Sequence, residues 1–441
     1  MLLVFVLLFT QVLRAAEYKL SEEPPPESIA EYEDTEISLM GEFRRDPRVI
    51  FRPIDEWRKT KGPFLRDGQI KYNFRTYYFD GKLPDESEPK AWAVGGQLDY
   101  NSGVWRDTVA IGASWYSAFD LSSNSDASNS RLFSDTGNDV SIIGQAYVDF
   151  YWQGVTARFF RQELDLPYIN RFDNRMNPNA FEAYGVGKDE GNIQFVLAQV
   201  TKIKFRDGDK FVRMGEAAGV EGSDAGVTMA GAKWESPAGN YDIGFINQYT
   251  RNIFNTAYAE ANWKKQFNQN LGLNISGQFT DQRSVGDNRA GDFDTDTWGV
   301  RMAGSYRFAL LTFGFTQTDS GAAIRSPYGG RPTYLSMMIR NFDRANEKAW
   351  RVGLSYHFKR FGWPDLSTLV NVVKGRKARD PLTGEKLPDQ TEYDYTLDYK
   401  PSSGPLEGFW FRTRYAKVRE AGAGKVTDEI RVIVNYTLPI L

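Results

Sequence analysis

From Gln69 to the end of the chain, hydrophobic and polar residues alternate with a period of two. Between residues 271 and 280, Leu, Leu, Ile, Gly and Phe alternate with Gly, Asn, Ser, Gln and Thr. The stretches 297–307, 350–359 and 430–438 repeat the pattern. A period of two places successive side chains on opposite faces of a β-strand. Each predicted strand therefore has one apolar, aromatic-ended face and one face of small, polar or cationic residues.

Such segments recur about 18 times and are roughly 10 to 14 residues long, against the ~9–11 residues that a tilted strand needs to cross a bilayer. We place them at residues 69–79, 90–100, 104–117, 140–151, 154–162, 180–187, 191–204, 225–235, 240–250, 254–265, 270–282, 295–307, 309–318, 349–359, 366–375, 391–400, 408–417 and 429–439.

The connections between these segments alternate between short and long. Short ones include 101–103, 153–154, 237–239 and 267–269, and long ones lie near 118–139, 163–179, 205–224, 283–294, 319–348 and 376–390. A soluble sandwich has no reason to keep loop length in phase with strand parity, whereas transmembrane barrels have short periplasmic turns and long extracellular loops. The sequence therefore predicts an all-β fold: a transmembrane, antiparallel, up-and-down β-barrel of about 18 strands, wide enough for an aqueous channel.

Composition agrees with this fold class and excludes others. The chain has 54 Lys and Arg against 57 Asp and Glu, so no global basic field favours nucleic acid as a partner. A mean hydropathy of -0.50 suits a barrel, because only alternate residues meet lipid. No run of 18 apolar residues predicts a membrane-spanning helix. The absence of cysteine excludes disulfides and thiolate metal sites.

The first 67 residues differ from the rest. The apolar run 2–9, followed by Arg14, Ala15 and Ala16, predicts a signal peptide over residues 1–16; an ordinary apolar N-terminus is the alternative. Residues 17–67 are first acidic and then basic, without a strong period. We expect an N-terminal segment that is periplasmic or enters the lumen. Residues 68–441 form the predicted barrel.

The third long connection is dense in charges of both signs and is stiffened by Pro167 and Pro178. Such a loop can fold inward and narrow the pore, and a solvated surface loop is the alternative. Its candidate constriction residues are Glu163, Asp165, Tyr168, Arg171, Asp173 and Arg175.

Cations lie on the polar phase of several predicted strands, at Arg106, Arg301, Arg307, Arg351, Lys359, Arg412, Arg414 and Arg431. The last two strands pair with each other, so Arg412, Arg414 and Arg431 are expected to be near neighbours on one wall of the lumen. We call these three residues the arginine wall. Guanidinium groups bind carboxylates in a bidentate fashion, which favours carboxylate solutes. The alternative is that arginine merely fills and solubilises the lumen.

Motifs for catalysis and cofactors are missing from the sequence. The single histidine, His357, cannot build the usual zinc site, and no G-x-S-x-G elbow accompanies it. Asp292, Asp294 and Asp296 lack the Gly and Glu of a calcium loop, and no phosphate-binding loop occurs. We therefore expect a channel without enzymatic activity, metal or cofactor. A general diffusion porin is the alternative within that class, and an outer-membrane barrel enzyme is the alternative outside it.

Several motifs resemble the OprD-type porins, also called outer-membrane carboxylate channels. They are F-L-R-D-G-Q-I-K-Y-N-F-R-T-Y-Y-F-D from Phe64, R-Q-E-L-D-L-P-Y from Arg161, S-P-Y-G-G-R-P from Ser326, N-F-D-R-A-N-E-K-A-W from Asn341 and R-V-I-V-N-Y from Arg431. The resemblance spans residues 64–441, and the N-terminal segment looks longer than the family usually has.

The resemblance implies an 18-stranded barrel in the outer membrane of a Gram-negative bacterium, with inward-folded loops that form a narrow eyelet. It also implies a ladder of lumen arginines that guides small carboxylate solutes such as amino acids or aromatic acids. On this sequence the ladder maps onto Arg412, Arg414 and Arg431, and onto Arg158 and Arg161 beside the third loop. The expected partners are these solutes and outer-membrane lipid, and the expected assembly is a monomer or a loose homotrimer.

Overall fold

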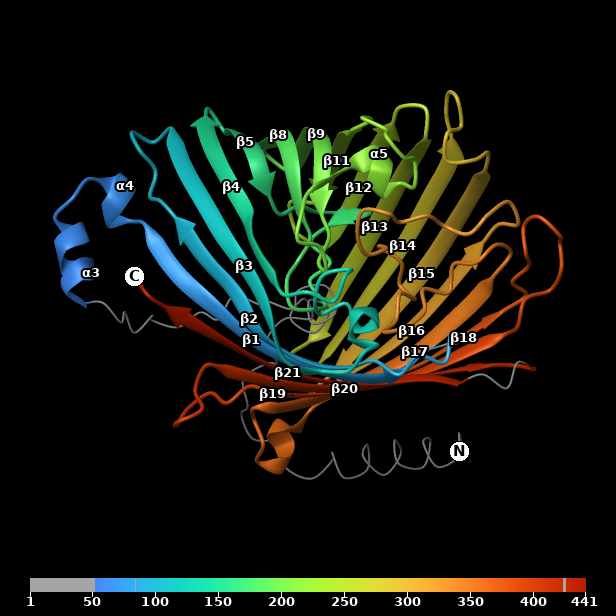
Figure 1. Ribbon diagram of the computed structural model, residues 1–441. Helices are drawn as coiled ribbons and strands as arrows, with labels where there is room; N and C mark the ends of the chain where they lie inside the picture. The colour runs from blue at the N-terminus through green and yellow to red at the C-terminus, as the bar shows by residue number, and fades with distance from the viewer. Residues whose placement is uncertain (1–51, 84, 423–425) are drawn as a thin grey trace.

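The computed structural model describes residues 52–83, 85–422 and 426–441. In these residues eighteen long strands follow one another around a closed barrel, each antiparallel to both neighbours (Figure 1). They are β1 (Gln69–Lys82), β2 (Lys90–Asn101), β3 (Val109–Ser123), β4 (Val140–Trp152), β5 (Val155–Gln162), β8 (Ala180–Glu190), β9 (Ile193–Lys204), β11 (Val227–Glu235), β12 (Tyr241–Thr250), β13 (Phe254–Asn268), β14 (Leu271–Ser284), β15 (Asp294–Tyr306), β16 (Ala309–Thr318), β17 (Lys348–His357), β18 (Leu366–Arg376), β19 (Gln390–Tyr399), β20 (Phe409–Glu420) and β21 (Val426–Pro439).

The first and last strands close the barrel. β1 pairs with β21 along its length, with Arg75 opposite Asn435, and the amide of Ile70 donates to the carbonyl of Leu441 at 3.0 Å. Closure leaves no unpaired strand edge, which a membrane requires because an unsatisfied backbone group in hydrocarbon costs several kcal/mol. The start of β1 and the end of the chain consequently lie at the same rim, which is the rim of the short turns.

The predicted fold class is confirmed, and most predicted strand boundaries agree with the structure to within three residues. The third strand is the exception, since it begins at Val109 instead of residue 104. Arg106 and Asp107 have φ angles of 49° and 55°, so the chain turns at a point where the sequence suggests continued alternation. The expectation that Arg106 lies on a strand is therefore wrong.

Arg307 and Lys359 were also expected on strands. Arg307 lies in the turn between β15 and β16, with a φ of 52°, and Lys359 lies in the short 3-10 helix η2 (Phe358–Phe361). The alternation continues past the hydrogen-bonded ladder at both positions, which is why the periodicity alone overextends these strands.

The two faces of the wall differ as the alternation predicts. On β14, the outward Phe279 is 46% exposed, whereas its neighbour Gln278 is 6% exposed and points inward. Large apolar side chains thus meet lipid and polar side chains fill the interior. None of the helices in the described part of the chain is long and apolar enough to cross a membrane.

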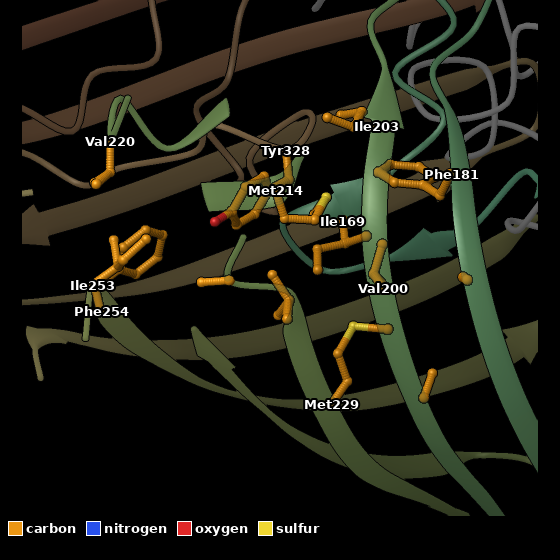
Figure 2. Packing of buried hydrophobic residues seen from close by; sticks show 14 of the residues in the cluster. Ile169, Phe181, Val200, Ile203, Met214, Val220, Met229, Ile253, Phe254 and Tyr328 are labelled. Carbon is orange, nitrogen blue, oxygen red and sulfur yellow. The ribbon is translucent and has the colours of Figure 1, made fainter. Parts of the chain in front are cut away.

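Several long loops fold into the barrel instead of standing away from it. They carry the short elements η1 (Ala127–Ser130), β6 (Asp165–Leu166), β7 (Ile169–Asn170), β10 (Val212–Arg213) and α5 (Met214–Ala217). Buried hydrophobic residues fix these elements against the inner wall, η1 in one cluster and the others in a second cluster. In Figure 2, Ile169, Met214 and Tyr328 of the loops lie beside Phe181, Val200 and Met229 of the strands. Each such side chain contributes about 1.5–3 kcal/mol on burial, so the loops are firmly packed.

At the rim of the short turns, two short helices precede β1: α3 (Arg52–Lys59) and α4 (Pro63–Arg66). The amide of Gly103, in the turn after β2, donates to the carbonyl of Phe64 at 2.9 Å and holds α4 against this rim. Figure 1 has both helices on the same side as the C-terminus. The predicted signal peptide and most of the segment 17–67 lie outside the described residues, so those boundaries stay predictions.

Candidate functional site

The arginine wall lies on the inner face of the barrel where the last strands meet. Arg412 and Arg414 alternate with outward residues on β20, and Arg431 lies on β21 directly opposite Arg414. Cα atoms of residues paired in this way are about 4.5–5.5 Å apart. The structure therefore brings the three predicted residues together on one wall.

The three guanidinium groups have different partners. Arg412 donates from Nε and Nη2 to Asp398 of β19, at 2.7 and 2.8 Å, and stacks over the ring of Trp410 at 4.4 Å. Arg431 forms an ion pair with Glu429 and donates to the carbonyl of Met338 at 3.0 Å.

Arg414 is the exception in this group. Its Nε donates to the hydroxyl of Thr396 at 3.1 Å, and within the described residues no carboxylate forms an ion pair with it. It is half-buried, whereas Arg412 and Arg431 are buried. Arg414 is thus the member of the arginine wall whose charge no ion pair with a carboxylate of the described residues balances.

Arg75 extends the cationic surface onto β1 and was missed in the sequence. It donates to the side chain of Asn435 at 2.8 Å and to Asp173 at 2.7 Å, and it also donates to the carbonyl of Arg175. Arg75 and Asp173 side chains are 5% and 1% exposed, so this is a buried ion pair. Aromatic residues occupy both phases of β1, so the period alone does not say which phase faces the lumen.

The loop 163–179, which contains six of the predicted site residues, crosses the interior of the barrel. On one side, Asp173 forms an ion pair with Arg75 of β1 at 2.7 Å, and Arg171 forms ion pairs within the loop with Glu163 at 3.4 Å and Asp173 at 3.3 Å. On the other, the hydroxyl of Tyr168 hydrogen-bonds with that of Thr280 on β14 at 2.9 Å. The loop is therefore attached to both sides of the lumen instead of being solvated outside it.

The buried position of this loop and its ion pairs shift the pKa values of two of its carboxyl groups. Burial raises the pKa of Glu163, and the nearby guanidinium of Arg171 opposes that rise. Burial also favours the neutral form of Asp173, but the guanidiniums of Arg75 and Arg171 outweigh it and hold the pKa of Asp173 below its usual range. Asp173 consequently stays ionised at neutral pH.

The two remaining candidate residues of the loop, Arg175 and Asp165, differ in burial and in their contacts. Arg175 is buried, donates from Nε to the carbonyl of Ser130 at 2.8 Å and lies over the ring of Phe79 at 5.5 Å. Asp165 is exposed on β6. Arg175 therefore connects the loop to its neighbour 124–139, whereas Asp165 lies at the exposed surface of the loop.

The loop 319–347 covers another part of the inner wall. The amides of Ile339 and Arg340 donate to the carboxylate of Glu392 on β19, at 2.7 and 2.8 Å. The two inward loops also touch, because Asn170 donates to the carbonyl of Gly330 and accepts from its amide, each at 2.8 Å. The two loops are therefore in direct contact inside the barrel.

Arg301 and Arg351 lie beneath this second loop. Both pair with Gly314 of β16, from its two sides. Arg351 donates to the carbonyl of Tyr334 at 3.2 Å, and the guanidinium of Arg301 lies over the ring of Tyr334 at 4.9 Å. They belong to the inner surface as predicted, but they hold the loop and lie on other strands than the arginine wall.

Arg158 and Arg161 are on β5, away from the strands that carry the arginine wall. Arg158 forms a bidentate pair with Asp149, at 2.6 and 2.7 Å, and stacks over Tyr147 at 3.9 Å. Arg161 pairs with Glu182 at 3.3 Å. The structure does not bring these two residues together with Arg412, Arg414 and Arg431.

Within the described residues, no group of three or more His, Cys, Asp or Glu side chains is arranged to hold a metal ion. His357 is the last residue of β17, at the rim of the short turns. The inward side chains described above instead form ion pairs and hydrogen bonds with one another.

A family model described as outer membrane porin, OprD family, matches residues 62–440. No curated protein matches the chain. The match covers the whole barrel together with α4.

Solved structures with the same fold come from Pseudomonas aeruginosa. OpdK in complex with vanillate has a TM-score of 0.77 and 22% identity, with 85% of this chain and 100% of OpdK covered. OccK9 (OpdG) has a TM-score of 0.78 and 22% identity, with 86% and 100% covered. OccK2 (OpdF) in complex with glucuronate has a TM-score of 0.73 and 17% identity, with 86% and 100% covered.

Proposed function

The chain belongs to the OprD family of outer membrane porins, and we propose that it is a passive channel selective for small solutes that carry a carboxylate, such as amino acids or aromatic acids. The porin fold and the Gram-negative outer membrane follow from the family. Porins of this family are channels and not enzymes. The preference for carboxylates is supported by the arginine wall, and vanillate and glucuronate, bound by two similar porins, both carry a carboxylate.

Arg414 is the observation that carries the proposal. Its guanidinium lies between Arg412 and Arg431, whose charges Asp398 and Glu429 already balance. One uncompensated cation remains among these five side chains. A carboxylate is attracted by that charge and can form two parallel hydrogen bonds with the guanidinium. Because the neighbouring cations are neutralised, the attraction is too weak to trap the solute, as conduction requires.

The constriction belongs to the same proposal. We infer that the loops 163–179 and 319–347 form it together, since both lie inside the barrel and touch at Asn170 and Gly330. Solute would pass this narrow level and then reach the arginine wall. Glu163, Asp165, Tyr168, Arg171, Asp173 and Arg175 would shape the opening, with Arg158 and Arg161 on the wall beside it.

The test compares two single substitutions that each remove one inward cation. Arg414→Gln removes the unpaired guanidinium, and Arg301→Gln removes a cation from β15 as the matched control. Reversal potential in a salt gradient and liposome swelling with a carboxylate or a neutral sugar are measured for both. We expect Arg414→Gln to lower carboxylate uptake more than sugar uptake and more than Arg301→Gln does.

Equal loss of carboxylate and sugar uptake would contradict the proposal and favour a general diffusion porin. Adding Arg412→Gln to Arg414→Gln enlarges the expected effect, since it removes a second positive charge. Heat-dependent mobility on a gel establishes that each variant barrel is folded before the uptake values are compared.

A further inference from the structure

The outer surface of the barrel carries a cluster of cations on three strands, β17, β18 and β20, within the four neighbouring strands β17–β20. We call it the basic rim; it consists of Lys348 on β17, Lys374 and Arg376 on β18, and Lys417 and Arg419 on β20. All five are exposed or half-exposed. Their immediate strand neighbours, such as Ala349, Val373 and Val418, are buried inside the barrel, so the cations point outward.

The basic rim lies at the end of the barrel that carries the long loops. Lys348 is opposite Arg376, Lys374 is opposite Trp350 and Thr391, and Thr391 is opposite Arg419. Lys417 is one step further from the loops, opposite Tyr393. Beyond it the outward residues are apolar, including Val352, Tyr395 and Leu397, which are 41%, 47% and 46% exposed. The cations therefore begin where the lipid-facing apolar band ends.

Acidic partners are nearly missing from this surface. None of the five cations forms an ion pair with another residue of the described ranges. Asp428, opposite Lys417, is the acidic residue paired with them across strands. On β14 and β15, at the same end of the barrel, the outward residues instead include Asp281, Asp294 and Asp296, and Arg283 forms an ion pair with Asp281. The basic character is thus local to β17–β20.

We propose that the basic rim binds the phosphate groups of the phosphorylated glycolipid in the outer leaflet, the lipid A part of lipopolysaccharide. Uncompensated cations at the border of an apolar surface fit an anionic headgroup whose acyl chains lie on that surface. Lys and Arg both bind phosphate, and Arg does so in a bidentate fashion. The cations lie near the interface, where outward Lys and Arg destabilise a barrel far less than they do at the middle of the bilayer, so the barrel tolerates them.

The test uses the full-length protein in a non-ionic detergent. Bisphosphorylated lipid A and its dephosphorylated form are the probes, and native mass spectrometry measures the fraction of protein that carries lipid. The test variant combines Lys374→Gln, Arg376→Gln and Arg419→Gln. The control combines Arg106→Gln, Lys265→Gln and Arg307→Gln, which remove the same charge at the opposite rim, where each cation lies over an aromatic ring.

We expect the native protein to prefer bisphosphorylated lipid A, the test variant to bind it roughly ten- to hundredfold more weakly, and the control to bind it normally. Inorganic phosphate at millimolar concentration should not displace the lipid. Equal binding by the two variants, or equal binding of the dephosphorylated lipid, would overturn the proposal. So would a native protein that forms oligomers through this surface without lipid A while the test variant stays monomeric. Heat-dependent gel mobility verifies folding.

Discussion

Two sides of the lumen are built by the same alternation but offer different chemistry to the loop that crosses between them. The charged side comprises the arginine wall, Arg75 and the carboxylates Asp398 and Glu429. The opposite side, which we call the neutral side because a neutral hydrogen bond holds the loop there, comprises the inward residues Ile246, Gln248 and Thr250 of β12 and Ser276, Gln278 and Thr280 of β14, together with the inward carboxylate Glu260 of β13 opposite Gln278. The loop 163–179 meets the first through the buried Arg75–Asp173 ion pair and the second through the neutral Tyr168–Thr280 hydrogen bond.

This difference indicates that the residues that hold the loop 163–179 in position and the residues that attract anions need not be the same throughout the lumen. A buried ion pair holds the loop strongly because removing one partner leaves an unpaired charge, which costs about 3–5 kcal/mol. A neutral hydrogen bond contributes about 0.5–1.5 kcal/mol. The charged side therefore holds the loop in place and offers a site to anions, whereas the neutral side mainly supports the loop.

The largest expected effect comes from breaking the anchor on the charged side. Asp173→Asn leaves Arg75 without its anionic partner and should destabilise the inward position of the loop by about 3–5 kcal/mol. Tyr168→Phe, the matched change on the neutral side, should cost about 0.5–1.5 kcal/mol. Trypsin cleavage at Arg171 in the folded barrel measures loop opening. Similar cleavage of both variants would show that the two anchors are equivalent.

A charge added to the neutral side tests which residues of that side face the lumen. Leu273→Arg places a cation among the outward apolar residues 271–279 of β14 and should destabilise the barrel by at most about 2–4 kcal/mol, the cost at the middle of the bilayer. Asn274→Arg, one residue later, should be tolerated and should raise anion selectivity. The fraction of heat-modifiable folded barrel and the reversal potential report the two effects. Equal damage from both substitutions would refute the assignment of faces.

Removing the bridge between the two sides should widen the channel. Deletion of residues 170–177 removes the part of the loop that contacts both Arg75 and Gly330. Single-channel conductance should rise markedly while the barrel stays folded. A folded barrel with unchanged conductance would assign the constriction to the loop 319–347 alone.

The smallest effect is a pH dependence that separates Asp343 of the loop 319–347 from Asp173 of the loop 163–179. In the loop 319–347, Asp343 forms an ion pair with Arg331 at 2.5 Å, and burial raises the pKa of Asp343 to about 6. This value lies above that of an unfolded aspartate, about 3.9, so the folded loop binds the proton more tightly. The cost of burying the charged carboxylate is therefore present above pH 6 and is relieved as the pH falls through about 6.

Acidification from pH 7.5 to 5 should thus neutralise Asp343, leave Arg331 charged and shift the reversal potential slightly toward anions. Asp173 should stay ionised over this range, because Arg75 and Arg171 hold its pKa low. Asp343→Asn is the control, and it should show no such shift. A shift that persists in this variant would assign the pH dependence to another group.

Much of the barrel could be predicted from the sequence because a strand that faces lipid on one side and water on the other must alternate. Arg412, Arg414 and Arg431 were found in this way, since each lies in the regular part of a strand. The predicted start of β3 was wrong because Arg106 and Asp107 form a left-handed turn that contains neither glycine nor proline.

The partners of the arginines could not be predicted. The Arg75–Asp173 pair joins residues 98 positions apart, and it depends on where a loop lies inside the closed barrel. Likewise, Asp398 neutralises Arg412 only because the register of β19 and β20 puts them directly opposite. Alternation assigns a face to each residue, but it carries no information about register between strands.

The pairing of β1 with β21 also constrains how the molecule is made. Lys71 lies opposite Pro439, so this strand pair joins residues from near the two ends of the barrel sequence. Contacts at such separation form late, because a long loop must be closed before they are made. Until the last strand has been exported and inserted, the sheet has two open edges that can pair with other chains. Loss of the final strand would therefore leave an aggregation-prone open sheet and not a slightly smaller channel.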